Sequence, residues 1–185
     1  MAQAKGYGVA GAYNAPLKTD TYLFKDSGLI PNSALPLIVR QGAVTPGGSD
    51  PAKTFEETFR RNGWTNSWRN GIFDYHHYQS TAHEVLGIVS GSASVRFGGE
   101  SGDVVALSAG DVVVVPAGVG HALIRGSDDL LVVGAYADGR DWDTIRDDPQ
   151  AIAEARRRIA QVPLPASDPV DGPNGPLTRL WTRGG

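Results

Sequence analysis

A series of short apolar segments separated by glycine-rich turns fills the middle of this chain and limits its fold more than any other feature. In most of these segments hydrophobic and polar residues alternate with a period of two, as they do in half-buried β-strands. Strands of this length and density predict an all-β sandwich or barrel. Strands and helices do not alternate along the chain, so a parallel sheet is not expected. The segments are Asp74–Tyr78, His83–Val89, Ser92–Phe97, Val104–Leu107, Asp111–Val115, His121–Ile124 and Leu130–Tyr136.

The segment 51–62 precedes all of these strands and carries the sequence signals of an α-helix. Asp50 can accept hydrogen bonds as the N-cap, and Pro51 stands at the first helical position, where its missing N–H costs nothing. Asn62-Gly63 supplies a left-handed stop. Because the apolar residues of this segment share one face, we expect the helix to pack outside the barrel as structural support.

A second helix is expected after the last strand. Asp148 would cap it, Pro149 would open it, and good helix formers fill Ala151–Ala160. The remaining residues are rich in Pro and Gly, which predicts an extended tail that packs on the barrel or on a partner subunit. The expected organisation is a flexible N-terminal arm over 1–20, one barrel domain over 21–137 that includes the first helix, and a C-terminal helix and tail over 138–185.

Composition excludes several classes of function. Seventeen basic against twenty acidic residues give a net charge of −3, which does not favour nucleic acid or an anionic membrane as a partner. The absence of cysteine excludes disulfides, thiolate metal sites and cysteine nucleophiles. The N-terminus lacks the apolar stretch of a signal peptide, and no apolar run approaches the ~20 residues needed to span a bilayer. We therefore expect a soluble, cytoplasmic protein.

Four polar side chains have the types and spacing of metal ligands. His77 and Gln79 share one face of a strand because side chains alternate. Glu84 follows the next turn, and His121 begins a later strand, so a barrel can bring all four together. Neutral imidazoles with carboxylate and amide oxygens suit one divalent transition metal such as Fe, Mn, Ni or Zn. The alternative is that these groups only hydrogen-bond to one another in a polar pocket.

Other candidates surround this set. His83 should point to the outside of the barrel, since its neighbour Glu84 occupies the inward face. A register slip of one residue would exchange the two, so His83 is a reserve ligand. Phe73, Tyr75 and Trp68 are candidates for lining the substrate pocket, although aromatic residues in a small barrel are more often part of the core. Tyr75 is also the candidate catalytic residue, as a group that moves protons.

The two segments that carry these residues resemble the two conserved motifs of the cupin family, written G-x5-H-x-H-x(3,4)-E-x6-G and G-x5-P-x-G-x2-H-x3-N. The matching positions are Gly71, His77, Glu84, Gly91, Gly110, Pro116, Gly118 and His121. Segments 80–87 and 168–177 are further similar to the poorly characterised YjlB-like group of cupins. The resemblance implies a single jelly-roll β-barrel with flanking helices, and it maps the metal ligands of the family onto His77, Glu84 and His121.

Two residues depart from the motifs. Gln79 stands where cupins usually carry a second histidine, and its amide oxygen is a neutral and weaker donor than imidazole. Arg125 stands where the motif has asparagine, and it could clamp a substrate carboxylate or phosphate or simply be solvated beside a turn.

The resemblance implies a metal-dependent enzyme of the dioxygenase or isomerase type that acts on a small polar or anionic metabolite. The alternative is a non-catalytic cupin that binds a small molecule and has a degenerate metal site. The family hosts both kinds, so the fold alone does not select between them. Cupin barrels commonly pair, and residues 20–40 could be exchanged between subunits, so a homodimer is expected.

Overall fold

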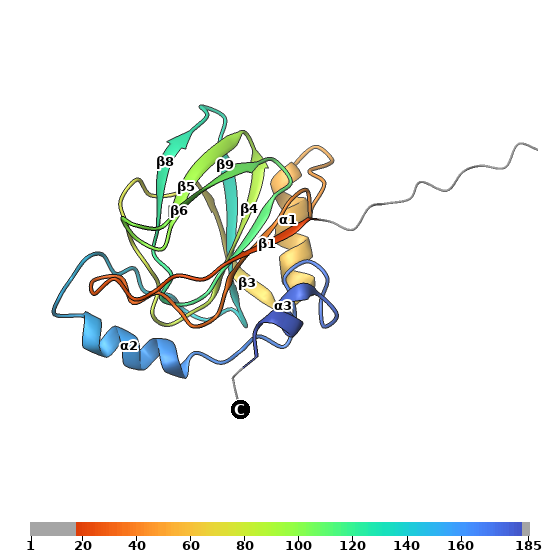
Figure 1. The fold of residues 1–185 in the computed structure, drawn as a ribbon. Helices are drawn as coiled ribbons and strands as arrows, with labels where there is room; N and C mark the ends of the chain where they lie inside the picture. Colours follow the sequence, from red (N-terminus) through yellow and green to blue (C-terminus); the bar gives the residue numbers. More distant parts are fainter. Residues whose placement is uncertain (1–17, 183–185) are drawn as a thin grey trace, which may run out of the picture.

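The computed structural model describes residues 18–182, which form two facing antiparallel β-sheets with three helices outside them (Figure 1). The larger sheet has six strands in the order β1-β2-β7-β4-β9-β3, and the smaller has three in the order β6-β5-β8. The all-β expectation is confirmed. The strands are β1 (Thr19–Tyr22), β2 (Leu37–Arg40), β3 (Trp64–Asn70), β4 (Glu84–Ser90), β5 (Ser92–Phe97), β6 (Asp103–Ser108), β7 (Val112–Val115), β8 (His121–Gly126) and β9 (Leu131–Ala137).

The larger sheet has a hydrophobic core on each of its faces, and β7 contributes to both. Val113 and Val115 belong to the core between the two sheets, whereas Val112 and Val114 belong to a second core on the outer face. A strand buried on both faces reads as a continuous apolar run rather than an alternating one. This accounts for the four successive valines of β7, which are all buried.

Helix α1 (Pro51–Arg61) covers the outer face of the larger sheet at Gly87 of β4. A Cβ atom at Gly87 would lie 2.4 Å from Cδ1 of Phe55, so the helix approaches as closely as a glycine allows. Pro51 opens the helix as expected. The expected cap is wrong in one respect, because the carboxylate of Asp50 makes no capping hydrogen bond and is instead bound by the guanidinium of Arg69 at 2.9–3.0 Å.

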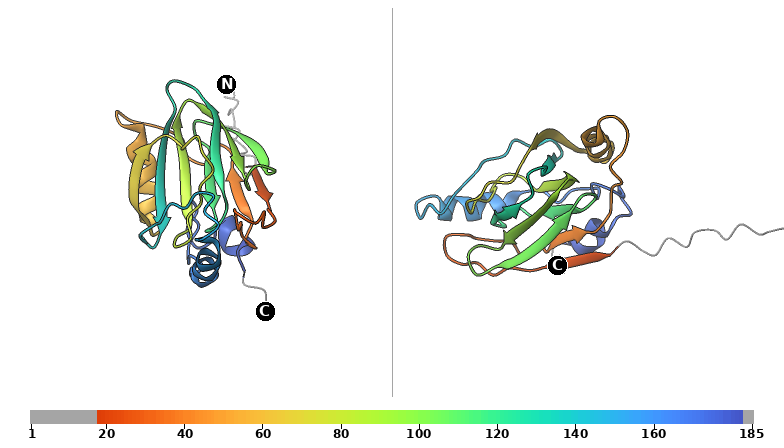
Figure 2. Two further views of the ribbon diagram at one scale, coloured as in Figure 1. Left: turned by 90° about the vertical axis from the view of Figure 1, so that its left-hand side faces the viewer. Right: turned by 90° about the horizontal axis from the view of Figure 1, so that it is seen from above.

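Helix α2 (Ile152–Gln161) lies across one end of the barrel, which is the lower end in Figure 1 and in the left-hand view of Figure 2. It begins three residues later than the expected start at Pro149. Asp148 does not cap it. The Asp148 carboxylate accepts the N–H of Gln150 at 2.9 Å, which makes a local turn ahead of the helix.

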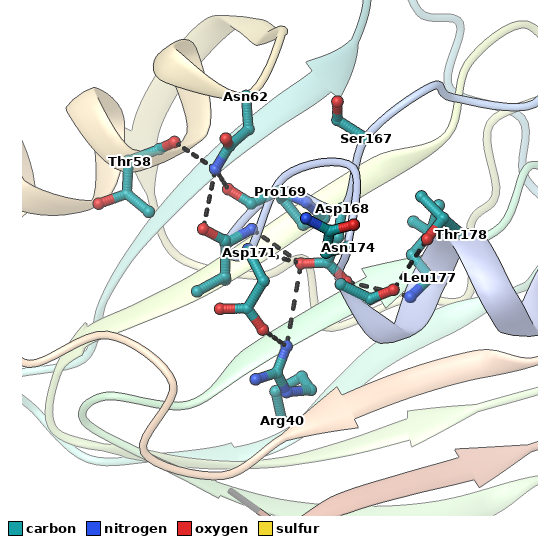
Figure 3. Close-up of polar contacts among 12 residues, drawn as sticks. Arg40, Thr58, Asn62, Ser167, Asp168, Pro169, Asp171, Asn174, Leu177 and Thr178 are labelled. Atoms are coloured by element: carbon teal, nitrogen blue, oxygen red, sulfur yellow. Dashed lines mark hydrogen bonds and ion pairs between the residues drawn. The ribbon is translucent and has the colours of Figure 1, made fainter.

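The C-terminal tail is only partly extended, contrary to expectation, because it contains the short helix α3 (Pro176–Leu180). It packs against the barrel as expected. Buried Asp168 accepts three backbone N–H groups of the tail, the last from Leu177 at 3.1 Å (Figure 3). The side-chain amide of Asn62, at the end of α1, donates to two tail carbonyls at 2.9 Å. Arg40 of β2 forms an ion pair with Asp171 at 2.8 Å.

Three expectations about the strands need correction. Residues 74–78 form no strand; only His77 and Tyr78 make isolated bridges, to His121 and Ile145. Trp64–Asn70, outside the expected strands, forms edge strand β3. β1 begins at Thr19, within the expected arm, and pairs with β2, which in turn pairs with β7. Residues 1–17 lie outside the described part.

Candidate functional site

His77 and His121 are brought side by side where the loop after β3 meets the first residue of β8. The two residues exchange both backbone hydrogen bonds, at 2.9 and 3.2 Å, as an antiparallel bridge. Their ring centroids are 4.2 Å apart. The Nδ1 atom of each ring lies against a backbone carbonyl, of Tyr75 at 3.1 Å and of Val119 at 3.3 Å. This arrangement fixes both rings and leaves Nε2 of each as the nitrogen available to a ligand.

Glu84 reaches the same place from the opposite sheet. It is the first residue of β4 and pairs directly with Tyr136 of β9. The Tyr136 hydroxyl donates to Oε1 of Glu84 at 3.0 Å, and it accepts the indole N–H of Trp68 at 2.9 Å. This hydrogen-bond chain, Trp68 to Tyr136 to Glu84, holds the carboxylate in one orientation. Its other oxygen, Oε2, lies 3.5 Å from Nε2 of His121.

These groups line a cavity of about 230 Å³ between the two sheets. His77, Gln79, Glu84 and His121 are all buried in its walls. The four candidate ligands are therefore brought together, as expected from their spacing. The remaining lining residues are Trp68, Asn70, Gly71, Ile72, Phe73, Leu86, Tyr136, Trp142 and Thr144.

Burial dominates the electrostatics of the cavity. It raises the pKa of Glu84 to about 7, although the hydrogen bond from Tyr136 and the nearby side chain of Gln79 act in the opposite direction. Burial also lowers the pKa of His77, and it lowers that of His121 well below the usual value, with the neighbouring His77 adding to the effect. The pKa of Tyr136 is raised by burial and by the adjacent Glu84 carboxyl. Both imidazoles are therefore neutral near pH 7, as metal ligands must be.

The donor chemistry of the cavity fits a divalent cation. Oε2 of Glu84 is buried and has no hydrogen-bond partner within the described chain, which is costly for a carboxylate oxygen unless something else binds it. Nε2 of His121 lies 3.5 Å from this oxygen, and His77 and Gln79 line the same cavity. Among residues 18–182, however, no group of three or more His, Cys, Asp or Glu side chains is arranged so that it could hold a metal ion.

Two predicted substrate-binding residues do not line the cavity. Tyr75 is stacked on Phe73 with ring centroids 4.9 Å apart, and the guanidinium of Arg146 lies 4.1 Å from its ring centre. Tyr75 faces a separate surface groove instead. Arg125 is exposed near the end of β8 and is absent from the cavity walls, so its position does not support a clamp on a ligand inside them. Trp68 and Phe73 do line the cavity.

His83, the reserve ligand, lies on the other side of the sheet from Glu84, because no register slip occurs before β4. Its Nδ1 accepts the backbone N–H of Ala117 at 2.9 Å, and its ring packs 4.7 Å from that of Trp181 in the tail. It borders a larger, open groove of about 870 Å³ beneath α2. The imidazole therefore belongs to the contact between barrel and tail, and it does not join the other ligand candidates.

Sequence reasoning missed Tyr136, Trp142, Thr144 and Asn70. Tyr136 is the last residue of an expected strand, and a tyrosine in such an apolar segment could have indicated a functional hydroxyl. Its pairing with Glu84, however, depends on the register between strands that are distant in the sequence. Trp142 and Thr144 come from the loop after β9, where no periodic pattern exists. Trp142 is placed by stacking on Tyr136, with ring centroids 4.4 Å apart. No local sequence pattern predicts such a contact.

Comparison with known proteins identifies the family. The sequence model of the cupin family matches residues 69–140. A relative from Bacillus subtilis (strain 168), "Uncharacterized protein YjlB", is 42% identical over 167 residues, which cover 90% of this chain and 98% of the relative. The chain belongs to the cupin family, in its YjlB-like group. The expected jelly-roll cupin fold is thereby confirmed.

Solved cupin structures resemble this YjlB-like cupin over part of its length. Acireductone dioxygenase from Bacillus anthracis, with a cadmium ion in its active centre, matches with a TM-score of 0.38 and 21% identity, over 51% of this chain and 63% of that chain. A deletion mutant of Bacillus subtilis oxalate decarboxylase matches with a TM-score of 0.36 and 18% identity, over 63% of this chain and 29% of that chain. This cupin thus spans less than two thirds of either enzyme.

Proposed function

We propose that this cupin binds one divalent transition metal through His77, Glu84 and His121, with the amide oxygen of Gln79 as a fourth donor. The observation that carries the proposal is the buried Oε2 of Glu84, which has no hydrogen-bond partner in the described chain and lies 3.5 Å from Nε2 of His121. A metal ion would satisfy both atoms at once. Two imidazoles and one carboxylate form the donor set of non-haem Fe(II) sites, which keep positions open for substrate.

The metal would supply a Lewis acid with open positions, which suits either a dioxygenase or an isomerase reaction on a small molecule. The residues of the chain have separate tasks in this proposal. The Tyr136 hydroxyl donates a hydrogen bond to the carboxylate of Glu84 and orients that carboxylate toward the metal position. The backbone carbonyls of Tyr75 and Val119 hold the two imidazoles. The aromatic walls reduce the access of water to the reacting atoms.

The proposal is tested by elemental analysis of protein purified without chelator or nickel resin. Wild-type protein is expected to carry close to one equivalent of Fe, Mn, Ni or Zn, and His121→Ala is expected to lose it. His76→Ala is the matched control, because His76 adjoins His77 in sequence but faces a surface groove. Absence of metal after incubation with each ion, or equal retention by His121→Ala, would contradict the proposal.

A second candidate function is a small-molecule-binding cupin without turnover. Two observations favour it: Gln79 replaces the usual histidine, and the described chain holds no ready-made group of three His, Asp or Glu ligands. Gln79→His separates the two functions. If the cavity is a metal site with a weak donor, this substitution is expected to raise metal affinity by about tenfold or more. If metal fails to bind even to this variant, the binding function is the better account.

A further inference from the structure

The mouth of the cavity presents aromatic rings that are held in place by their neighbours. Phe73 is 49% exposed and Trp142 is 42% exposed, although both also line the cavity. Phe73 is stacked on Tyr75, and Trp142 is stacked on Tyr136 at an interplanar angle of 10°. The two rings come from different loops. Large aromatic side chains fixed in this way, and only half covered, are prepared to receive a flat apolar surface.

Lys and Arg are absent from the cavity walls among the described residues, and Glu84 is the only acidic group there. The nearby guanidinium of Arg146 lies over the ring of Tyr75, outside the cavity. An anion that entered would lose its hydration without gaining a charged partner from the chain, which is unfavourable. The polar groups on offer are neutral amide and hydroxyl groups, at Asn70, Gln79 and Thr144.

The volume limits the size of the ligand. An apolar cavity of about 150 Å³ accepts benzene, and pockets for drug-sized molecules run from about 300 to 1,000 Å³. At about 230 Å³ this cavity lies between those two cases. The cavity itself has room for one ring with one or two small substituents, and a fused polycyclic compound would have to extend through the mouth.

We infer that the cavity selects a single planar ring with uncharged hydrogen-bonding substituents, which lies against Phe73 and Trp142 and directs a substituent toward Gln79 and Glu84. The sequence-based expectation was a small polar or anionic metabolite, and of these two kinds the inference selects the polar, uncharged one. The inference rests on the proposed function only in that both use the same cavity. It concerns what the protein walls select, so it is tested on protein from which metal has been removed.

Three probes of nearly equal size test the inference: benzamide, benzoate and cyclohexanecarboxamide. They differ from one another in charge or in planarity, and their dissociation constants are measured by saturation-transfer NMR and calorimetry on chelator-treated protein. Benzamide is expected to bind at least about tenfold more tightly than either of the others. Equal or tighter binding of benzoate overturns the claim about charge, and equal binding of cyclohexanecarboxamide overturns the claim about planarity. Failure of benzamide to bind at millimolar concentration overturns both.

Substitutions in the cavity wall test whether benzamide binds at the proposed position. Phe73→Leu and Trp142→Leu each keep an apolar residue at a half-exposed position, so the fold should be retained, and each is expected to weaken benzamide by about threefold to tenfold. Leu180→Ala removes an exposed apolar side chain that does not line the cavity and is the control for non-specific adsorption. Benzamide binding that is indifferent to both leucine variants overturns the proposed location. Metal content is measured separately on untreated protein, so a failure of the metal site and a failure of ring selection give different results.

Discussion

Glu84 should make the metal-free protein less stable as the pH rises through the range from about 4.5 to 7. The pKa of its carboxyl is about 7 in the folded protein, against 4.5 for an exposed glutamate, chiefly because the side chain is fully buried. A group whose pKa is raised by folding holds its proton more tightly in the folded state. Its favourable contribution is therefore complete below pH 4.5 and is lost by about pH 7. At 1.36 kcal/mol per pH unit the loss amounts to about 3 kcal/mol.

The measurement compares wild-type protein with Glu84→Gln, which keeps the shape of the side chain and removes its titration. The comparison is needed because His77 and His121 act in the opposite direction: their pKa values are lowered by burial, so they favour the folded state as the pH rises toward 6.5. Urea denaturation of chelator-treated protein at pH 4.5 and pH 7.5 gives the free energy of unfolding of each protein. Wild type is expected to lose about 3 kcal/mol relative to the variant.

A difference between the two proteins that does not change with pH, or that grows in favour of wild type, would refute this reasoning. Such a result would mean that Glu84 is already ionised at acidic pH, as the partner of a protonated His121. Addition of metal should reverse the trend above pH 7, because a metal ion binds the ionised carboxylate. Equal m-values in the two proteins would show that the comparison reports stability and not a changed denatured state.

Two other predictions follow from the fold, and a third follows from the resemblance to cupins. Gly87→Ala should lower the free energy of unfolding by about 1–3 kcal/mol in thermal or urea melts, because the new methyl group would collide with Phe55 of α1; an unchanged midpoint would mean that the helix is not tightly docked. Trp181→Ala should cost about 3–5 kcal/mol, because this buried indole also donates to the carbonyl of Pro36 at 2.8 Å. Light scattering at micromolar concentration should give the mass of the expected homodimer, and a monomeric mass would contradict this prediction.

Local sequence patterns predicted the strands best where one or both faces of the strand are buried. Four such strands coincide with expected apolar segments to within one residue at either end: β4, β5, β7 and β9. The pattern failed in the connection from β3 to β4, two strands of the same larger sheet. Residues 74–78 alternate like a strand, yet they run from β3 to β4 with only two bridges. The polar edge strand β3 had no apolar alternation to mark it.

The residues of the candidate site also differ in how well the sequence predicts them. The motif spacing was enough to predict that His77, Glu84 and His121 meet, because turn lengths and strand parity can be read from the local sequence. Tyr136 and Trp142 could not be placed in this way. Their positions depend on which strands become neighbours and on how a loop folds back, and those properties are decided by the packing of the whole barrel.

The outer core behind the larger sheet means that the stretch matched by the cupin family model is shorter than the folding unit of this protein. The family match covers residues 69–140, but the outer face of β4 and β7 within that stretch is covered by α1 and by the tail around Trp181. A protein trimmed to the matched residues would expose a broad apolar surface and would also lose β2, the neighbour of β7. Domain swaps and library designs based on this cupin should therefore carry segments 37–61 and 162–182 along with the barrel.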